Sequence, residues 1–470
     1  MATDRDGFRD GDLPPLPARF WQLVGPGAVL VGLSIGAGEL IVWPRVTAAY
    51  GASMTWAAVL GVFLQLWLNL EIGRYTLATG ESVYSGYARL SAALPALFLG
   101  LNVAGWIVPG WARACGGALK VLLVGPEGWG GPTAWTAITF TMVALVLFGP
   151  RAIYRSVEHT VEALVVMIVV GLIGIAVSVT SAPVWIELGR GIINIGYKDP
   201  AMPAYELFAA LVFAGAGGTA NLFYCYYLRD KGWGMGALLP AVVNPLRGRE
   251  ERAGASGFRI RDTAENRQRW RAWMRHATLD QAAFFWLLNT FTILLFIVGA
   301  LAVLRPLGIV PEQELLVWQE ASILEASWGT TGKYVFLLVG VATLFSTQLT
   351  LLDGVARSCA DLLHGNFAWA RRTPMSVWYV RIALGWIAAG LVLTYAYEAI
   401  PPIVFLLSAG FFGGIAMAIY TPLTLIINLR YLPPACRPSR ARRAVMVGLS
   451  LLYGVFAIVA TVQLLARWLG

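Results

Sequence analysis

Apolar residues gather in eleven windows along the chain, separated by mostly short polar or charged connections. Each window approaches the ~20 apolar residues that a helix needs to cross the hydrocarbon core of a bilayer. The pattern therefore predicts an all-α membrane protein with about eleven transmembrane helices. The windows cover residues 22–48, 53–73, 93–123, 132–149, 160–182, 204–228, 279–304, 334–362, 376–397, 401–428 and 444–468.

The connections predict the orientation, because cytoplasmic loops of membrane proteins are enriched in arginine and lysine. The long connection 229–275 holds eleven basic residues against five acidic ones, 305–333 is acidic, and 429–443 is basic again. This alternation predicts a multi-pass protein of the cell membrane with a cytoplasmic N-terminal tail at residues 1–21. Within the long connection, the Arg- and Trp-rich stretch Arg267–Arg275 is either part of a solvated loop or an amphipathic helix on the anionic inner leaflet.

The composition supports the membrane assignment. Of the 470 residues, 58% are hydrophobic and 13% are charged, whereas soluble domains average about 45–50% apolar and about 25% charged residues. These values exclude a water-soluble enzyme, a disordered protein and a nucleic-acid binder. The four cysteines form no CxxC pair, and no hydrolase or Walker motif is present, so we expect no catalytic residues, no cofactor and no zinc site.

Two glycine clusters lie at corresponding places in the two halves of the chain. The first window contains GLSIGAGE, with Gly32, Gly36 and Gly38, and the sixth contains AGAGGTAN, with Gly217 and Gly218. Such a pair predicts a transporter with inverted repeats, in which the first and sixth helices unwind at the midplane and hold the solute. Close helix packing is the alternative reason for glycine. The repeats would cover residues 22–182 and 204–428, followed by a final helix at 444–468.

Several motifs resemble the Nramp family of metal-ion transporters. They are GPGAVLVG at the start of the first window, ATGES (Ala78–Ser82), DQAAFFWLLNT around Asp280 and Asn289, STQLT (Ser346–Thr350), and SAGFFGGIAMAIYTPL ending at Pro422. The resemblance runs from about residue 22 to 465 and implies a LeuT-type fold. The chain is thus identified as a divergent relative of this family.

The resemblance also implies that the metal site of the family is lost. Where the family has DPGN in the first helix, this chain has Gly36-Ala37-Gly38-Glu39, and where the family has MPHN in the sixth, it has Gly218-Thr219-Ala220-Asn221. The carboxylate and thioether that would select Mn(II) or Fe(II) are therefore both missing. The acids of the third helix align with Gly110 and Arg113. Arg113 is either part of a substrate site or the partner of an acid such as Glu39 or Asp353.

The altered motifs change the solute that the site would favour. A helix break without a carboxylate exposes the N-termini of two half-helices, each equivalent to roughly +0.5 charge, and these favour an anion. We therefore expect a small inorganic anion such as bicarbonate as the solute and the lipid bilayer as a partner, with a coupling ion as an open alternative. The candidate substrate-binding residues are Gly36, Ala37, Gly38, Glu39, Gly217, Gly218, Thr219, Asn221 and Arg113.

Glu39 leaves alternatives open. Its carboxylate could cap the outer half-helix, titrate and so couple proton movement to solute movement, or receive a hydrated Mg²⁺, which needs only one or two carboxylates. A non-transporting membrane sensor, with residues 229–275 as the output element, is a further alternative. The sequence leaves the oligomeric state open.

Overall fold

The computed structural model describes residues 7–18, 25–149, 153–239, 257–311 and 315–469. The rest of the predicted N-terminal tail and residues 240–256 of the basic connection, including Arg247, Arg249 and Arg252, lie outside the described residues. Among the described residues, nine helices are long and apolar enough to cross a membrane, and Pro132–Phe148 is a shorter apolar helix. Together with the broken sixth segment, these helices correspond to the eleven predicted windows, which we call spans 1 to 11.

The first five spans follow the order of the windows. They are span 1 (α1 Pro26–Ser34, η2 Gly38–Val42 and α2 Trp43–Tyr50), span 2 (η3 Ala52–Met54 and α3 Thr55–Thr79), span 3 (α5 Leu94–Trp106 and α6 Gly110–Val124), span 4 (α7 Pro132–Phe148) and span 5 (α8 Ile153–Val179).

The remaining six spans contain the longest helices. They are span 6 (α10 Ala204–Val212, η4 Gly218–Phe223 and α11 Tyr224–Asp230), span 7 (α12 Ala264–Asp280, η6 Gln281–Leu288, α13 Asn289–Gly299 and η7 Ala300–Leu304), span 8 (α15 Ser322–Asn366), span 9 (α16 Met375–Ala396), span 10 (α17 Pro402–Tyr431) and span 11 (α18 Arg440–Leu469).

Short elements connect the spans. They are α4 (Val83–Leu90), α9 (Ala182–Ile193), η5 (Gly234–Leu238), α14 (Leu316–Glu320), η8 (Ala370–Arg372), η9 (Pro434–Cys436) and the strands β1 (Arg9–Gly11) and β2 (Phe258–Ile260). The two strands pair in parallel, with Asp10 opposite Arg259.

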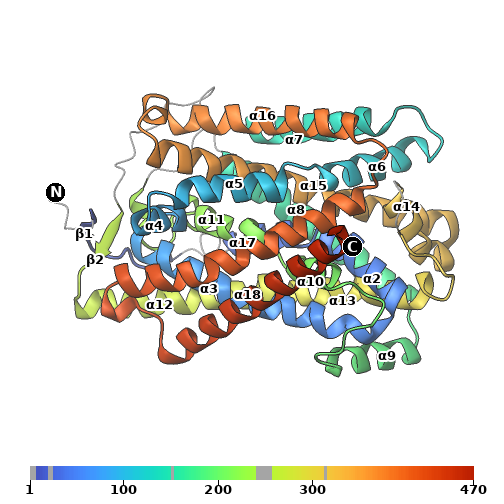
Figure 1. Cartoon of the computed structure of the whole chain (residues 1–470), viewed down its shortest axis with the longest axis horizontal. Helices are drawn as coiled ribbons and strands as arrows, with labels where there is room; N and C mark the ends of the chain where they lie inside the picture. The colour runs from blue at the N-terminus through green and yellow to red at the C-terminus, as the bar shows by residue number, and fades with distance from the viewer. Residues whose placement is uncertain (1–6, 19–24, 150–152, 240–256, 312–314, 470) are drawn as a thin grey trace.

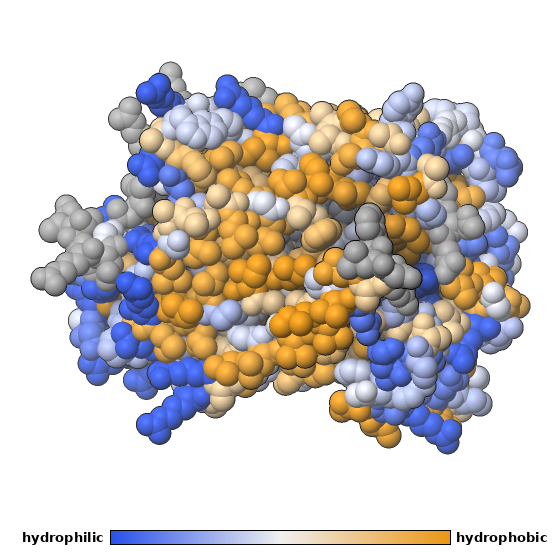
Figure 2. Space-filling model, viewed as in Figure 1, coloured by the Kyte–Doolittle hydropathy of each residue, from blue (hydrophilic) through white to orange (hydrophobic). Residues whose placement is uncertain are grey.

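The spans run along the long axis of the molecule (Figure 1). Span 1 packs between spans 5 and 8, and span 10 packs against spans 6 and 11. Hydrophobic residues cover the middle of the visible face, and hydrophilic residues gather at its two ends (Figure 2). Span 1 is buried over its whole hydrophobic window, whereas span 11 is buried over 22% of it. Span 1 therefore lies at the centre of the bundle and span 11 at its periphery.

The Arg- and Trp-rich stretch Arg267–Arg275 lies in a helix, α12, which continues into span 7. Its apolar face is covered by the protein. Trp270 and Trp273 are buried, and Trp273 Nε1 donates a 2.7 Å hydrogen bond to the carbonyl of Pro14 in the N-terminal tail. This stretch is thus helical and its tryptophans pack on the chain, while its position on the inner leaflet stays a prediction.

Candidate functional site

Span 1 is broken beside the predicted glycines. Helix α1 ends at Ser34, Ile35 leaves the helical region with φ −69° and ψ 83°, and η2 begins at Gly38. A methyl group placed on Gly36 would lie 1.9 Å from Thr347 Oγ1, and one on Gly38 would lie 2.2 Å from the carbonyl oxygen of Phe213. The glycines therefore let span 1 pack directly on spans 8 and 6.

Span 6 is broken over a longer stretch. Helix α10 ends at Val212, and regular structure resumes only at Gly218, as a tight 3₁₀ turn. Gly217 and Gly218 have φ values of +69° and +51°, which side chains other than glycine rarely adopt. The predicted unwinding of both spans is confirmed.

Span 3 carries a third break that the sequence analysis did not identify. Helix α5 ends at Trp106, and α6 begins at Gly110 after Pro109. Proline has no N–H to continue the first helix, and its fixed φ suits the start of the second. The N-terminus of α6 therefore lies within the bundle, with its first N–H groups lacking intrahelical acceptors.

Side chains from neighbouring spans satisfy the backbone groups that the break in span 6 frees. Gln65 Nε2 donates to the carbonyl of Val212 at 2.9 Å, and Gln65 Oε1 accepts from the N–H of Gly217 at 3.0 Å. Asn289 Nδ2 donates to the carbonyl of Ala214 at 2.8 Å. Such partners are what permits an irregular backbone at membrane depth.

Side chains of spans 3 and 10 bind the residues at the C-terminal end of the same break. Tyr420 Oη donates to the carbonyl of Gly218 at 2.8 Å and accepts from Asn221 Nδ2 at 3.2 Å. Trp106 Nε1 donates to Thr219 Oγ1 at 2.8 Å. The predicted site residues Gly217, Gly218, Thr219 and Asn221 thus shape the break through contacts within the protein.

A small buried cavity of about 20 Å³ lies between the three breaks. None of its lining residues is charged. They are Leu33, Ser34, Ala37, Gly38, Trp106, Trp111, Phe213, Gly215, Ala216, Thr347, Leu351 and Leu406. Ser34 Oγ and Trp111 Nε1 are buried and have no hydrogen-bond partner among the described residues. By this measure the cavity has room for about one or two water molecules.

The predicted site residues divide into three groups. Ala37 and Gly38 line the cavity. Gly36 and the four residues of span 6 lie at the breaks without lining it. Glu39 and Arg113 are buried outside the lining.

Glu39 is fully buried in the first turn of η2, and neither carboxylate oxygen has a hydrogen-bond partner among the described residues. It makes no capping hydrogen bond. Thr292 of span 7 is the neighbouring hydroxyl, but this hydroxyl bonds the carbonyls of Leu288 and Asn289, each at 3.1 Å. A buried carboxylate without partners is costly unless a proton or cation neutralises it.

Arg113 lies against a turn of the backbone, and its role in substrate binding stays a prediction. Its guanidinium donates to the backbone carbonyls of Tyr397 and Ile400, at 3.0 and 2.9 Å, and to that of Glu398 at 3.0 Å. These carbonyls lie in the turn between α16 and α17. Arg113 therefore anchors this turn, as a cation does at a helix C-terminus. The expected pairing with Glu39 or Asp353 is not seen, since the ion pair of Asp353 is with Arg357.

Two carboxylates lie against the first residues of span 1. A methyl group placed on Gly25 would lie 1.9 Å from Glu158 Oε1, and one on Gly27 would lie 2.3 Å from Asp280 Oδ2. Glu158 also accepts a 2.5 Å hydrogen bond from Lys231. The two glycines of the GPG motif thus allow spans 5 and 7 to hold the N-terminus of α1, whose partial positive charge favours carboxylates.

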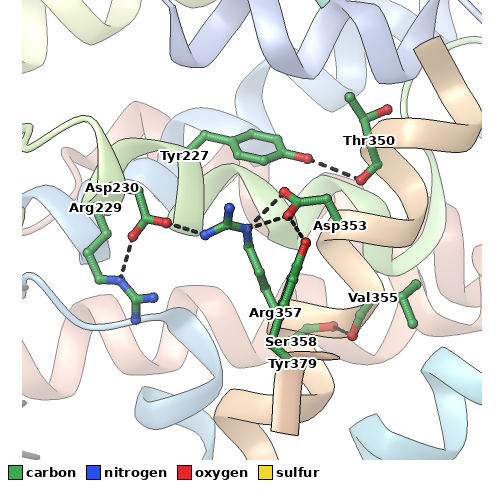
Figure 3. A network of polar contacts seen from close by, with 9 residues as sticks. All are labelled: Tyr227, Arg229, Asp230, Thr350, Asp353, Val355, Arg357, Ser358 and Tyr379. Carbon is green, nitrogen blue, oxygen red and sulfur yellow. Dashed lines mark hydrogen bonds and ion pairs between the residues drawn. The ribbon is translucent and has the colours of Figure 1, made fainter. Parts of the chain in front are cut away.

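A buried ion network joins helix α11 of span 6 to spans 8 and 9 (Figure 3). Arg357 Nε lies 2.8 Å from Asp353 Oδ2, Arg357 also pairs with Asp230, and all three side chains are fully buried. Tyr379 Oη donates to Asp353 at 2.7 Å, and Arg229 Nε lies 3.3 Å from Asp230. This network fixes the end of α11 on α15.

The described residues contain no group of three or more histidine, cysteine, aspartate or glutamate side chains that could hold a metal ion. Four further residues of the site, Gln65, Trp106, Trp111 and Tyr420, were not predicted from the sequence. Their polar or aromatic side chains inside apolar windows could have indicated them.

No protein-family description matches the sequence, and no curated protein matches it at the sequence level. Solved structures do match. A mutant of the manganese transporter of Eremococcus coleocola has a TM-score of 0.64 at 15% identity and covers 98% of this chain and 90% of its own.

Two further structures are similar over most of their length. MhsT in complex with L-phenylalanine has a TM-score of 0.55 at 15% identity, with coverage of 97% of this chain and 99% of its own. Mhp1, a nucleobase-cation-symport-1 family transporter with bromovinylhydantoin bound, has a TM-score of 0.54 at 13% identity, with coverage of 96% and 94%.

These likenesses define the class of fold. The chain is a multi-pass membrane protein with the LeuT-type fold, which confirms the predicted fold class. Two of these structures, that of the Eremococcus coleocola protein and that of Mhp1, are of transporters. The assignment to a divergent branch of the Nramp family, the repeat boundaries and the cytoplasmic N-terminus stay predictions.

Proposed function

We propose that the protein is a secondary transporter that moves a small inorganic anion, with bicarbonate as the first candidate. The observation that supports this most is the uncharged cavity between the breaks of spans 1, 3 and 6. Transporters of this fold class bind solutes between unwound helices near the midplane. Two of the structural neighbours named above, the manganese transporter and Mhp1, are transporters of this class.

The sign of the solute charge is argued from the groups around the cavity. Helices begin at Gly38, Gly110 and Gly218, and such positive ends favour an anion. The negative ends of α1, α5 and α10 lie at the same breaks and oppose this preference. Trp111 Nε1 and Ser34 Oγ are donors without partners. No carboxylate lines the cavity. Arg113 does not contribute, because it anchors the turn between α16 and α17.

Trp111→Phe tests the anion proposal, because it removes one N–H and keeps an aromatic ring. Uptake of labelled bicarbonate, with nitrate as a non-volatile oxyanion probe, is measured in proteoliposomes. Losing one hydrogen bond to a charged solute should weaken apparent affinity by roughly tenfold or more. Trp378→Phe is the matched control, because its Nε1 bonds the carbonyl of Ala370 away from the cavity. Anion uptake that is absent, or unaffected by Trp111→Phe, would contradict the proposal.

A divalent cation such as Mg²⁺ is the second candidate, and the observation that favours it is Glu39. Its unpartnered carboxylate follows Gly38, which lines the cavity. Glu39→Gln should abolish uptake of Mg²⁺ if the cation is the solute. If an anion is the solute, the same change should leave anion binding intact and alter only the pH dependence of uptake. Mn²⁺ and Fe²⁺ are not expected to bind tightly, because the family motifs for them are missing.

Ligand binding without flux in the same vesicles would favour the alternative that the protein is a non-transporting sensor.

A further inference from the structure

A second cavity, remote from the transport site, lies where three distant segments of the chain meet. Its volume is about 520 Å³. One wall is Asp10 of β1, the next is formed by Arg259–Asp262, and the third by Arg430–Pro434 with Arg437. The last segment connects spans 10 and 11, so the cavity lies at the ends of two membrane helices. Hydrophilic residues gather at the end of the molecule that carries β1 and β2 (Figures 1 and 2).

The lining is strongly basic. It holds four arginines (Arg259, Arg261, Arg430 and Arg437) and two aspartates (Asp10 and Asp262), so the formal balance is 4 − 2 = +2. Asp262 accepts a 2.7 Å hydrogen bond from Arg267, which does not line the cavity. Asp10 lies opposite Arg259 in the strand pair. Asp262 is thus engaged outside the cavity, and Arg261 likewise lies 3.3 Å from Asp12, which does not line the cavity.

Two of the arginines, both exposed, make contacts within the protein but have no acidic partner among the described residues. Arg437 Nε donates to the carbonyl of Leu432 at 2.9 Å, which orients its guanidinium. Arg430 lies over the ring of Tyr431 at 5.5 Å. Among the described residues, neither forms an ion pair. Positioning by contacts within the protein reduces the entropy that these side chains lose when an anion binds.

We propose that this cavity binds a phosphate group, either on the headgroup of an anionic lipid or on a free phosphorylated small molecule. Arginine guanidinium groups match the geometry of phosphate oxygens and bind them with paired charge-assisted hydrogen bonds. The cavity volume falls within the range typical of small-molecule sites, about 300–1,000 Å³. A ligand here would contact the N-terminal tail, the end of the basic connection and the link between spans 10 and 11 at once.

The double change Arg430→Gln and Arg437→Gln tests the proposal. Binding to the purified full-length protein is measured by native mass spectrometry and by thermal shift, with phosphatidylglycerol or phosphatidylcholine in one arm and inorganic phosphate or glycerol 3-phosphate in the other. The natural protein should bind a phosphate-bearing ligand saturably and in preference to phosphatidylcholine. The double variant should bind it at least tenfold more weakly. Binding of phosphatidylglycerol alone identifies the lipid as the source, and comparable binding of glycerol 3-phosphate identifies the free compound.

Arg372→Gln is the matched control, because Arg372 lies in η8, outside the cavity lining. Equal loss of binding in this control and in the double variant would show a general charge effect and overturn the proposal. Unchanged binding in the double variant would overturn it as well. Arg430 is exposed, so the single change Arg430→Gln provides a second variant if the double variant is poorly folded.

Discussion

The N–H of Gly217 donates a 3.0 Å hydrogen bond to Oε1 of Gln65, a side chain of span 2 that also donates to the carbonyl of Val212. One amide thus bridges both ends of the break in span 6. The break is held open by a side chain that does not line the cavity.

Gln65→Met should therefore destabilise the protein. Methionine has a similar length but leaves the carbonyl of Val212 and the N–H of Gly217 without partners, at about 1–3 kcal/mol for each buried group. The melting temperature in detergent should fall and flux should be lost. The exposed Gln268 provides the control Gln268→Met, which should melt like the natural protein. Equal melting of both variants would contradict the bridging role.

Gly27→Ala should loosen helix α1 of span 1. Its methyl group would lie 2.3 Å from Asp280 Oδ2, so either the Asp280 carboxylate gives up its place at the N-terminus of α1 or α1 moves away from span 7. With Ser34→Cys as a reporter in the cavity lining, thiol reagents should label the protein faster in the Gly27→Ala background. The four natural cysteines are buried, which keeps the background low. Gly448→Ala is the control, since nothing lies within 4 Å of its methyl position. Similar labelling rates would count against a tight contact at Gly27.

Arg357→Gln should be one of the most destabilising single changes. It leaves the buried carboxylate of Asp353 without its cation and Asp230 with Arg229 alone, and breaking a buried pair in this way costs about 3–5 kcal/mol. Thermal unfolding in detergent measures the loss. Arg267→Gln removes an exposed pair with Asp262 and should leave the melting temperature unchanged. If the two variants melted alike, the network in Figure 3 would not stabilise the fold.

Arg113→Gln should lower stability and spare solute affinity. The change removes hydrogen bonds to three backbone carbonyls in the turn between α16 and α17, and Arg113 is not among the residues that line the cavity. The folded fraction in proteoliposomes should keep the apparent affinity of the natural protein for its solute. If the variant bound the solute more weakly while its melting temperature stayed normal, Arg113 would belong to the substrate site.

Glu320 should make stability depend on pH. It lies in α14, outside the candidate spans, and its buried carboxylate has no partner among the described residues. Burial raises its pKa well above the ordinary value for glutamate. The folded state therefore binds the proton more tightly than the unfolded state. The stability that this proton contributes is fully present below the ordinary pKa of glutamate and is lost as pH rises through the pKa of Glu320 in the folded state.

Glu320→Gln should accordingly raise the melting temperature more at pH 8 than at pH 5. Glu325→Gln is the comparison, because Glu325 is partly exposed and pairs with Lys333 at 2.7 Å. A shift of the same size at both pH values would mean that the carboxyl of Glu320 does not titrate in this range.

The fold was accessible from sequence because its signals are local. Apolar windows predict spans, and the glycine clusters at Gly36 and Gly217 marked two of the three breaks. The third break was missed because Ile107 and Val108 are apolar and Pro109 alone does not distinguish a kink from a break.

The site was less accessible because its polar contacts join distant segments. Nothing near Arg113 indicates that the turn at residues 397–400 supplies its acceptors. Likewise, Gln65 and Tyr420 gain their roles from a break 146 or more residues away. A charged residue inside a span is consistent both with a functional role and with a structural one. Its partners in the structure are needed to distinguish the two.

The side chains that satisfy the freed backbone of span 6 and the residues that line the cavity are separate sets, although Trp106 both lines the cavity and bonds Thr219. Gln65, Asn289 and Tyr420 meet the hydrogen-bonding needs of the backbone in span 6 and do not line the cavity. Lining positions such as Ser34, Ala37 and Ala216 can therefore be exchanged without leaving those backbone groups unsatisfied. Selectivity in this architecture is free to diverge, by natural variation or by design, while the folding of the membrane core stays the same.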